Sequence, residues 1–170
     1  WKLSAALVTG NACIVKPASV TPLTTLKLAE YCKEAGIPDG VVNVITGPGS
    51  TVGEALVAHP GVARIGFTGD TSTGKRIMSV ASDQAKHVGL ELGGNNAMIV
   101  LADADLTAAV EGAIWGSFFN TGQVCAASSR LLVHESLYDE FVERFVEEAK
   151  KLRVGDPMNP ETILGPVPYK

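Results

Sequence analysis

The sequence predicts an α/β protein with a parallel sheet and helices on both of its faces. Short apolar runs of strand type alternate with helical segments, and the connections between them are only a few residues long. Such alternation is typical of βα units, whose strands are parallel. In the first half of the chain the strand-type runs are residues 11–16, 41–45 and 63–67, and the helical segments are residues 22–35, 49–58 and 71–82.

Helix 22–35 has both its start and its end marked in the sequence. Thr21 is expected to be the N-cap and Pro22 the first helical position. Gly36 and Pro38 are expected to end the helix. Apolar residues recur at i, i+3, i+4 and i+7, namely Leu28, Tyr31, Cys32 and Ala35. This periodicity predicts one apolar face, with Cys32 buried on it.

A second α/β region is predicted to begin at Gly93-Gly94, because two adjacent glycines between apolar runs indicate a hinge. Asp103 or Asp105 is expected to cap the next helix, and Ser136 with Asp139 is expected to form a capping box on the last one. The expected elements are a strand at 97–101, a helix along 106–117, a small-residue loop at 118–129, a strand at 131–134 and a helix along 138–152.

Composition and charge argue against several function classes. The 170 residues carry a net charge of −4 with mixed signs, so no nucleic-acid partner is expected. The longest uncharged apolar run, residues 97–102, is far shorter than the ~20 residues that span a bilayer, and no signal peptide is expected. The three scattered histidines predict no metal site. Three cysteines without a CxxC motif favour a reduced, cytoplasmic setting.

The segment GFTGDTSTGKR at 66–76 has the glycine and lysine spacing of a phosphate-binding P-loop, in Gly69, Gly74 and Lys75. A P-loop needs a hydroxyl after its lysine to bind Mg²⁺, and Arg76 has none. Asp70 would also place a carboxylate inside a cradle for phosphate. Two other interpretations stay open: a glycine turn that only caps a helix, and a turn whose N–H groups face a dinucleotide.

Two side chains are candidates for covalent chemistry. Cys125 lies in FFNTGQVCAASSR, residues 118–130, where small neighbours give a thiol access, whereas Cys13 and Cys32 are predicted to be buried and inert. Glu91 ends an apolar segment, and burial there would make its carboxylate a better proton acceptor for activating water. No histidine is placed by sequence beside Cys125, but a pair formed in space stays open.

In combination these motifs resemble the aldehyde dehydrogenase family. GFTGDTSTG, LELGGNN at 90–96 and FFNTGQVCAASSR follow one another in that family's order and spacing. The head of the chain, WKLSAALVTGNACIVKPASVTPLTTL, and VVNVITGPGSTVG at 41–53 resemble its cofactor segments. The resemblance covers essentially the whole chain, and GFTGDTSTGKR then reads as the family's glycine turn.

The resemblance implies a chemistry for both candidates. Cys125 would attack an aldehyde to give a thiohemiacetal, and its backbone N–H would donate to the oxyanion. Hydride transfer to NAD or NADP would leave a thioester, which water activated by Glu91 would hydrolyse to a carboxylic acid. Two alternatives remain: a catalytically silent dinucleotide-binding or structural relative, and a thiol esterase that uses Cys125 alone.

The resemblance also implies a set of cofactor-binding residues. Lys16 would contact the adenosine ribose or a 2′-phosphate, and Ser19 occupies a position where a carboxylate would repel that phosphate, so NADP should be tolerated. Many members of the family have Ser at the position of Asp70, so the resemblance does not imply a contact between Asp70 and phosphate. The full set is Lys16, Ser19, Gly49, Gly53, Phe67, Thr68, Gly69, Asp70 and Leu92.

The resemblance divides the chain into two parts. Residues 1–92 would belong to a Rossmann-like cofactor domain, and residues 93–170 would begin a catalytic domain that carries Cys125. Both ends of the sequence look cut, so the chain is expected to be a fragment that is inactive by itself. The full-length protein is expected to be a homodimer or homotetramer that acts on a small-molecule aldehyde.

Overall fold

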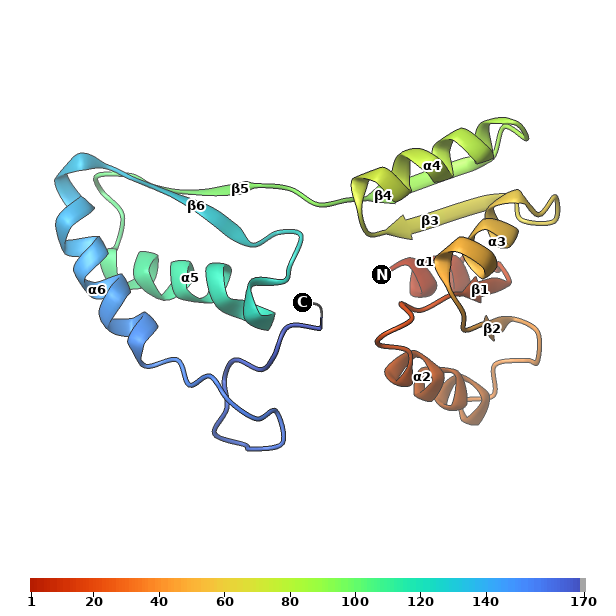
Figure 1. Cartoon of the computed structure of the whole chain (residues 1–170), viewed down its shortest axis with the longest axis horizontal. Helices are drawn as coiled ribbons and strands as arrows, with labels where there is room; N and C mark the ends of the chain where they lie inside the picture. The colour runs from red at the N-terminus through yellow and green to blue at the C-terminus, as the bar shows by residue number, and fades with distance from the viewer. Residues whose placement is uncertain (169–170) are drawn as a thin grey trace. The chain divides into compact units, whose positions relative to one another are not determined.

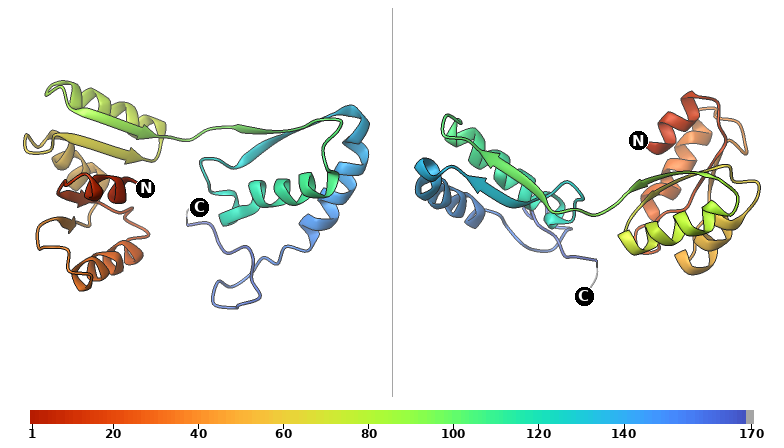
Figure 2. Two further views of the ribbon diagram at one scale, coloured as in Figure 1. Left: turned by 180° about the vertical axis from the view of Figure 1, so that it is seen from behind. Right: turned by 90° about the horizontal axis from the view of Figure 1, so that it is seen from above.

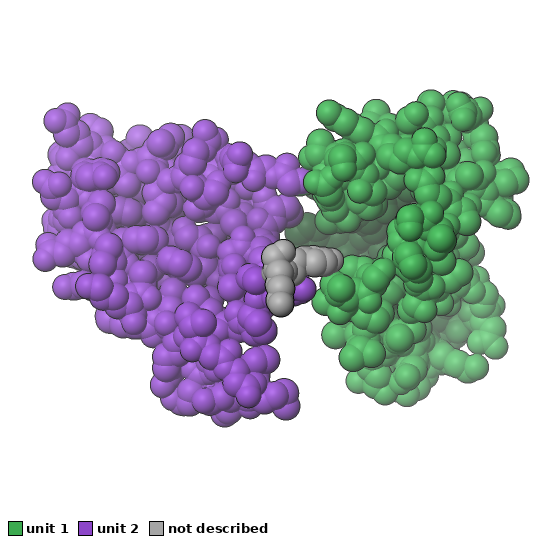
Figure 3. Space-filling view, viewed as in Figure 1, with its two compact units in different colours: residues 1–92 green, residues 93–170 purple. Residues whose placement is uncertain are grey.

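The computed structural model describes residues 1–168, and the chain divides into two compact units. Unit 1 comprises Trp1–Leu92 and unit 2 begins at Gly93 (Figure 3). Each unit has its own helices and parallel strands (Figure 1), which confirms the predicted α/β class. No helix within residues 1–168 is long and apolar enough to cross a membrane. The same residues contain no group of three or more His, Cys, Asp or Glu side chains that could hold a metal ion.

Unit 1 is built from two parallel strand pairs, β1 with β2 and β3 with β4. Its elements are α1 (Lys2–Val8), β1 (Cys13–Val15), α2 (Leu23–Glu34), β2 (Val42–Val44), the π-helical turn η1 (Gly49–Gly53), α3 (Glu54–Ala58), β3 (Arg64–Thr68), α4 (Thr71–Ser82) and β4 (His87–Glu91). The strands are parallel, as predicted, and they form two separate pairs. β1 and β2 have three residues each and pair only with each other among the described strands.

Helix α2 differs from its prediction in two ways. It begins at Leu23, one residue late, and Thr21 makes no side-chain cap; instead its backbone N–H bonds to the carbonyl of Ala18. None of its residues is buried, and Leu28 and Tyr31 are 44% and 54% exposed. The apolar periodicity therefore predicted the helix correctly, but its prediction of burial is wrong within this chain.

Helix α4 has the predicted bounds and packs on β4 through a glycine. A Cβ on the buried Gly74 would lie 2.8 Å from Cδ2 of Leu92 and 3.5 Å from Cδ1 of Leu90. The first separation is shorter than van der Waals contact, so a larger residue at this position would force the side chain of Leu92 to move. Ile77 and Ala81 continue the buried stripe of the helix.

Unit 2 places two helices against a two-stranded parallel sheet (Figures 1 and 2). Its elements are β5 (Asn96–Val100), α5 (Leu106–Phe118), the 3₁₀ turn η2 (Phe119–Gly122), β6 (Ser128–Val133), the 3₁₀ turn η3 (Glu135–Leu137) and α6 (Tyr138–Lys150). The core combines Val100 from β5, Phe141 from α6 and three residues of α5, namely Ala109, Val110 and Ala113. This core fixes the two ends of the Cys125 loop, because α5 leads into it and β6 leaves it.

Both helices of unit 2 begin at side-chain caps or turns that the sequence only partly indicates. Asp105 caps α5 by accepting from the N–H of Ala108 at 3.0 Å, one of the two predicted choices. The capping box predicted for Ser136 and Asp139 is wrong. Nδ1 of His134 accepts from the N–H of Ser136 at 3.2 Å, and the 3₁₀ turn η3 leads directly into α6.

Candidate active site and cofactor cradle

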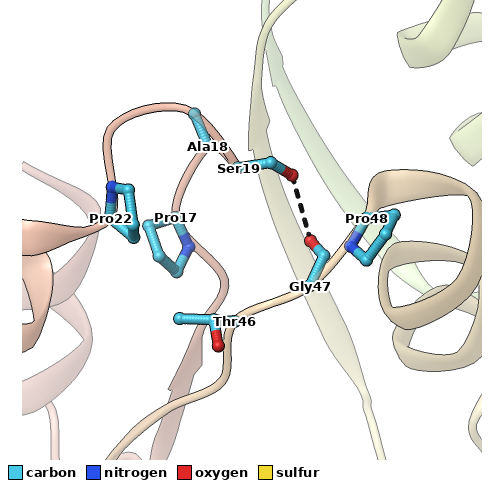
Figure 4. A pocket seen from close by; sticks show the side chains of 7 residues that line it. All are labelled: Pro17, Ala18, Ser19, Pro22, Thr46, Gly47 and Pro48. Atoms are coloured by element: carbon cyan, nitrogen blue, oxygen red, sulfur yellow. Dashed lines mark hydrogen bonds between the residues drawn. The ribbon is translucent and has the colours of Figure 1, made fainter.

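A polar cradle forms where β1 and β2 end. Parallel strands place their carboxyl ends at the same edge, so Lys16 after β1 and Gly47 after β2 come together. Nζ of Lys16 donates to the carbonyl of Gly47 at 3.0 Å and to that of Pro17 at 2.8 Å. Oγ of Ser19 donates to the same Gly47 carbonyl at 3.2 Å (Figure 4). Two predicted cofactor residues thus converge on one backbone oxygen.

A small pocket of about 140 Å³ opens beside this oxygen (Figure 4). It is lined by Pro17, Ala18, Ser19, Pro22, Thr46, Gly47 and Pro48. Its walls are mostly apolar ring and methyl groups, with hydroxyls at the rim, a combination suited to the sugar or flat ring of a nucleotide. The sequence reasoning missed Gly47 and the prolines of this pocket, although the run Thr46-Gly47-Pro48-Gly49 carries strong turn signals.

Gly49 and Gly53 mark the two ends of η1, which follows the pocket directly. The N–H groups of Thr51, Val52 and Gly53 all bond to the carbonyl of Pro48, at 3.0–3.4 Å, which tightens the turn. A Cβ on Gly53 would lie 3.9 Å from Cε of Lys16, so this glycine is next to the lysine stem. The region around Gly49 is open, with no atom within 4 Å of a Cβ placed there.

Gly47 is the most constrained residue of the cradle. Its φ is +144°, and a Cβ there would lie 2.4 Å from Cγ2 of Val52. Any other residue would strain the backbone and also collide with the first turn of the helix that follows. The carbonyl that holds Lys16 and Ser19 therefore depends on a glycine at this position.

Gly47→Ala is expected to lower the free energy of unfolding by about 2 kcal/mol or more, the sum of backbone strain and overpacking. Urea denaturation of the two proteins measures the difference. Gly49→Ala is the matched control, because its added methyl meets open space, and it should stay within about 0.5 kcal/mol of the original. Equal stability for both variants would contradict the constraint assigned to Gly47.

The turn between β3 and α4 holds the next group of predicted residues. The N–H of Gly69 donates to the carbonyl of Glu91 at 3.1 Å. The ring of Phe67 lies over Gly69, so that a Cβ added to this glycine would be 2.5 Å from Cζ of the ring. The hydroxyl of Thr68 accepts from the ammonium of Lys2. These contacts bring Phe67, Thr68, Gly69 and Glu91 together at one end of the β3–β4 pair.

Asp70 caps helix α4 with its own carboxylate. Oδ1 accepts from the N–H of Ser72 at 2.7 Å and from its hydroxyl at 2.5 Å. The hydroxyl bond and then the N–H bond hold the pKa of Asp70 below its usual value, so it stays ionised at neutral pH. The cap of α4 thus forms through Ser72.

The P-loop interpretation finds no support in this geometry. Asp70 occupies the helix N-terminus where a phosphate would bind, and Gly74 serves the packing of α4 on β4. Arg76 uses both Nε and a terminal nitrogen to bond the two carboxylate oxygens of Glu54 at 3.2 Å, which raises its pKa. Asp70, Gly74 and Arg76 thus each have another role in unit 1.

Glu91 and Leu92 close unit 1, and their surroundings differ from the prediction for Glu91. The Glu91 side chain is exposed, so the expected burial is wrong within this chain. Strand β4 alternates exposed and half-buried residues, and Glu91 falls on its exposed face. The side chain of Leu92 instead turns inward against Gly74.

In unit 2, Cys125 has the exposed thiol that a nucleophile requires. Cys13 and Cys32 are half-buried rather than buried, because the strand and helix that carry them are only partly covered. The loop begins with Asn120 and Thr121 at φ +52° and +59° and continues through Gly122 at +74°. Few L-residues adopt such angles, least of all a β-branched one.

The backbone of Cys125 is held from strand β5. Its carbonyl accepts from Nδ2 of Asn96 at 2.6 Å. Sequence reasoning missed Asn96, since nothing in LELGGNN indicates that one of its two asparagines reaches the cysteine loop. Within the described part of unit 2, Nδ1 of His134 bonds to the hydroxyl and the N–H of Ser136 in its own turn.

The comparison with known proteins decides the family. The model described as "Aldehyde dehydrogenase family" matches residues 1–170, the whole chain. The chain belongs to the aldehyde dehydrogenase family. It is 53% identical over 167 residues to the cytosolic 10-formyltetrahydrofolate dehydrogenase of Pongo abelii, covering 98% of this chain and 18% of that protein. It is 50% identical to the betaine aldehyde dehydrogenase of Brucella ovis, covering 98% and 34%.

Solved structures of aldehyde dehydrogenases and related enzymes share the fold of this domain. PnpE from Pseudomonas sp. WBC-3 superposes with a TM-score of 0.96 at 49% identity, over 99% of this chain and 35% of that one. PnpE has also been solved in complex with nicotinamide adenine dinucleotide. An E. coli NADP-dependent enzyme superposes with a TM-score of 0.94 at 43% identity, covering 98% and 34%. The chain thus spans about a third of these proteins.

Proposed function

We propose that these residues form part of an NAD(P)⁺-dependent aldehyde dehydrogenase that oxidises a small aldehyde to its carboxylic acid. The exposed thiol of Cys125, in the loop between α5 and β6 of an aldehyde dehydrogenase chain, is the observation that carries the proposal. Its thiolate attacks the aldehyde carbon to give a thiohemiacetal, while the backbone N–H of Cys125 donates to the oxyanion. A cysteine in a purely structural relative would need neither access nor a fixed loop.

Glu91 is the proposed base for the second half of the reaction. When bound, NAD(P)⁺ supplies the hydride acceptor that converts the thiohemiacetal into a thioester. The carboxylate of Glu91 then takes a proton from water as the water attacks the thioester carbon, and the Cys125 thiolate leaves. Its exposure at the end of β4 leaves the carboxylate accessible to that water.

The cradle of unit 1 fits the adenosine end of the cofactor. Ser19 lines the 140 Å³ pocket, and the ammonium of Lys16 bonds to the carbonyl of Gly47, another lining residue. Gly49 and Gly53 allow the backbone of the cofactor-binding turn to come close. Phe67, Thr68, Gly69 and Leu92 are the proposed contacts toward the pyrophosphate and nicotinamide, and Asp70 borders them as the cap of α4. PnpE and the E. coli enzyme support use of both NAD and NADP.

Absorbance of the reduced nicotinamide tests the proposal in the full-length protein that carries these residues. We expect turnover with short aldehydes, and a kcat/KM for NADP⁺ within about tenfold of that for NAD⁺, because Ser19 brings no negative charge to the ribose. Ser19→Glu should lower kcat/KM for NADP⁺ by more than about tenfold and spare NAD⁺, since like charges then face each other. Dinucleotide binding without turnover of any aldehyde would leave the silent relative as the better account.

The remaining parts of the proposal concern the whole protein. The 10-formyltetrahydrofolate dehydrogenase relative is described as cytosolic, and a cytoplasmic location is proposed here on that likeness. The half-buried and exposed thiols of Cys13, Cys32 and Cys125 agree with a reducing compartment. A homodimeric or homotetrameric assembly is proposed for the full-length enzyme.

A further inference from the structure

Asn96, at the start of β5, contacts the loop of Cys125 at several points. Its Nδ2 donates to the carbonyl of Cys125 at 2.6 Å and to that of Ala127 at 3.4 Å. Its own carbonyl accepts from Oγ of Ser129 at 3.4 Å. Asn96 therefore holds the loop at Cys125, and it also contacts Ala127 and Ser129, where the chain enters β6.

The strand pairing is interrupted at this same residue. Asn96 pairs with Ser128, but the next residue, Ala97, pairs with Arg130. Ser129 is the extra residue of a bulge, which bends β6 as it leaves the loop. Arg130 reaches back to the carbonyl of Asn95 at 2.6 Å and closes the bulge on its far side. Bulges commonly redirect neighbouring side chains. This bulge follows Cys125 closely in the chain.

The other end of the loop carries backbone strain. Asn120, Thr121 and Gly122 all have positive φ, and a β-branched residue in that region persists only where its surroundings hold it. Cys125 and Ala126 are exposed, so apolar packing does little to hold the middle of the loop. A backbone bond from the N–H of Ala127 to the carbonyl of Val124 at 3.0 Å closes a turn around Cys125, and the hydrogen bonds from Asn96 tie this turn to strand β5.

We infer that Asn96 is a positioning residue for the proposed nucleophile: its side-chain amide fixes the Cys125 peptide and thereby the direction of the thiol. The inference rests on the proposed function for its catalytic consequence, but not for its structural one. Asn96 touches no reacting atom in this assignment. It acts through the carbonyl of Cys125, which accepts a hydrogen bond from the side-chain amide.

The adjacent Asn95 provides the matched control. It is the same residue type, equally exposed, and its side chain makes no hydrogen bond within residues 1–168. Four variants of the full-length protein are compared: Asn96→Ala, Asn96→Asp, Asn95→Ala and Asn95→Asp. Asn96→Asp keeps the shape of the side chain but removes its N–H donor. Asn95→Asp shows what an added negative charge alone does.

Hydrogen exchange followed by mass spectrometry measures the loop directly. Both Asn96 variants should speed exchange in residues 119–129 by about fivefold, the effect of losing one ordinary hydrogen bond, with the rest of the protein unchanged. In the same proteins kcat for aldehyde oxidation should fall about tenfold or more, because small misplacements of a reacting group are costly. KM for the cofactor should stay constant, and both Asn95 variants should match the original.

Four results separate the possibilities. Unchanged exchange in the Asn96 variants overturns the inference, and so does faster exchange with an unchanged kcat. An equal effect from the Asn95 variants overturns it as well, since charge or local unfolding then explains the loss. If the original protein oxidises no aldehyde but exchange in 119–129 still responds only to Asn96, the proposed function fails while the hold on the loop stands.

Discussion

Cys125→Ala is expected to abolish aldehyde oxidation, with kcat falling about 10⁴-fold or more while the cofactor still binds. An alanine cannot form the bond to the aldehyde carbon, so no thiohemiacetal exists from which a hydride can leave. The loop should keep its shape, because Cys125 contributes its carbonyl rather than its side chain to the hydrogen bond with Asn96. Absorbance of the reduced nicotinamide measures turnover, and fluorescence quenching measures binding of the dinucleotide.

The other two cysteines supply the control for this experiment. Cys13 in β1 and Cys32 in α2 are half-buried and distant in sequence from the loop, so Cys13→Ala and Cys32→Ala should retain turnover within about twofold, apart from modest losses of stability. Turnover that survives in Cys125→Ala, or that disappears equally in Cys13→Ala, would remove Cys125 from the role of nucleophile.

Glu91→Gln is expected to stop the reaction after its first half. Steady-state turnover should fall about 10²- to 10⁴-fold, because the amide cannot take a proton from the attacking water. A burst of about one equivalent of reduced nicotinamide per site should remain, since the thioester forms before the base is needed. Stopped-flow absorbance after mixing enzyme, cofactor and aldehyde resolves the burst from the slow phase that follows.

Glu111→Gln is a suitable control for the loss of charge. Glu111 is exposed on α5 of unit 2, and its replacement should leave both the burst and the steady state unchanged. A Glu91→Gln protein that loses the burst together with the steady state would assign Glu91 to an earlier step than hydrolysis. Unchanged steady-state turnover would exclude it as the base.

Local patterns in the sequence predicted the elements of this fold better than their burial. Helix α4 has the predicted bounds, because Asp70 and the residues after it carry both a cap and a clear helical period. The periodicity of α2 was equally clear, yet Leu28 and Tyr31 are exposed. A period reports which residues share a face; whether anything covers that face depends on segments far away in the chain.

The candidate site was predicted in its residue types but not in the contacts that hold it. Cys125 stood out through its small neighbours, and its exposure agrees with that reasoning. Asn96 gave no such signal, because its role depends on a hydrogen bond across 29 residues. The turn signals around Gly47 were visible, but its close approach to Val52 was not. For Glu91 the residue was identified but its burial was predicted wrongly. An apolar run along a strand does not fix which face of the strand its last residue occupies.

The shared acceptor in the cradle has a consequence for how a cofactor would be selected. Lys16 and Ser19 both donate to the carbonyl of Gly47, so a ribose that takes those donors replaces hydrogen bonds the protein already makes. An exchange of one neutral acceptor for another yields little net affinity. An incoming 2′-phosphate differs, because its negative charge strengthens the bond to the ammonium well beyond what a carbonyl offers. Recognition at this edge would thus rank ligands by their charge rather than by the number of contacts they make.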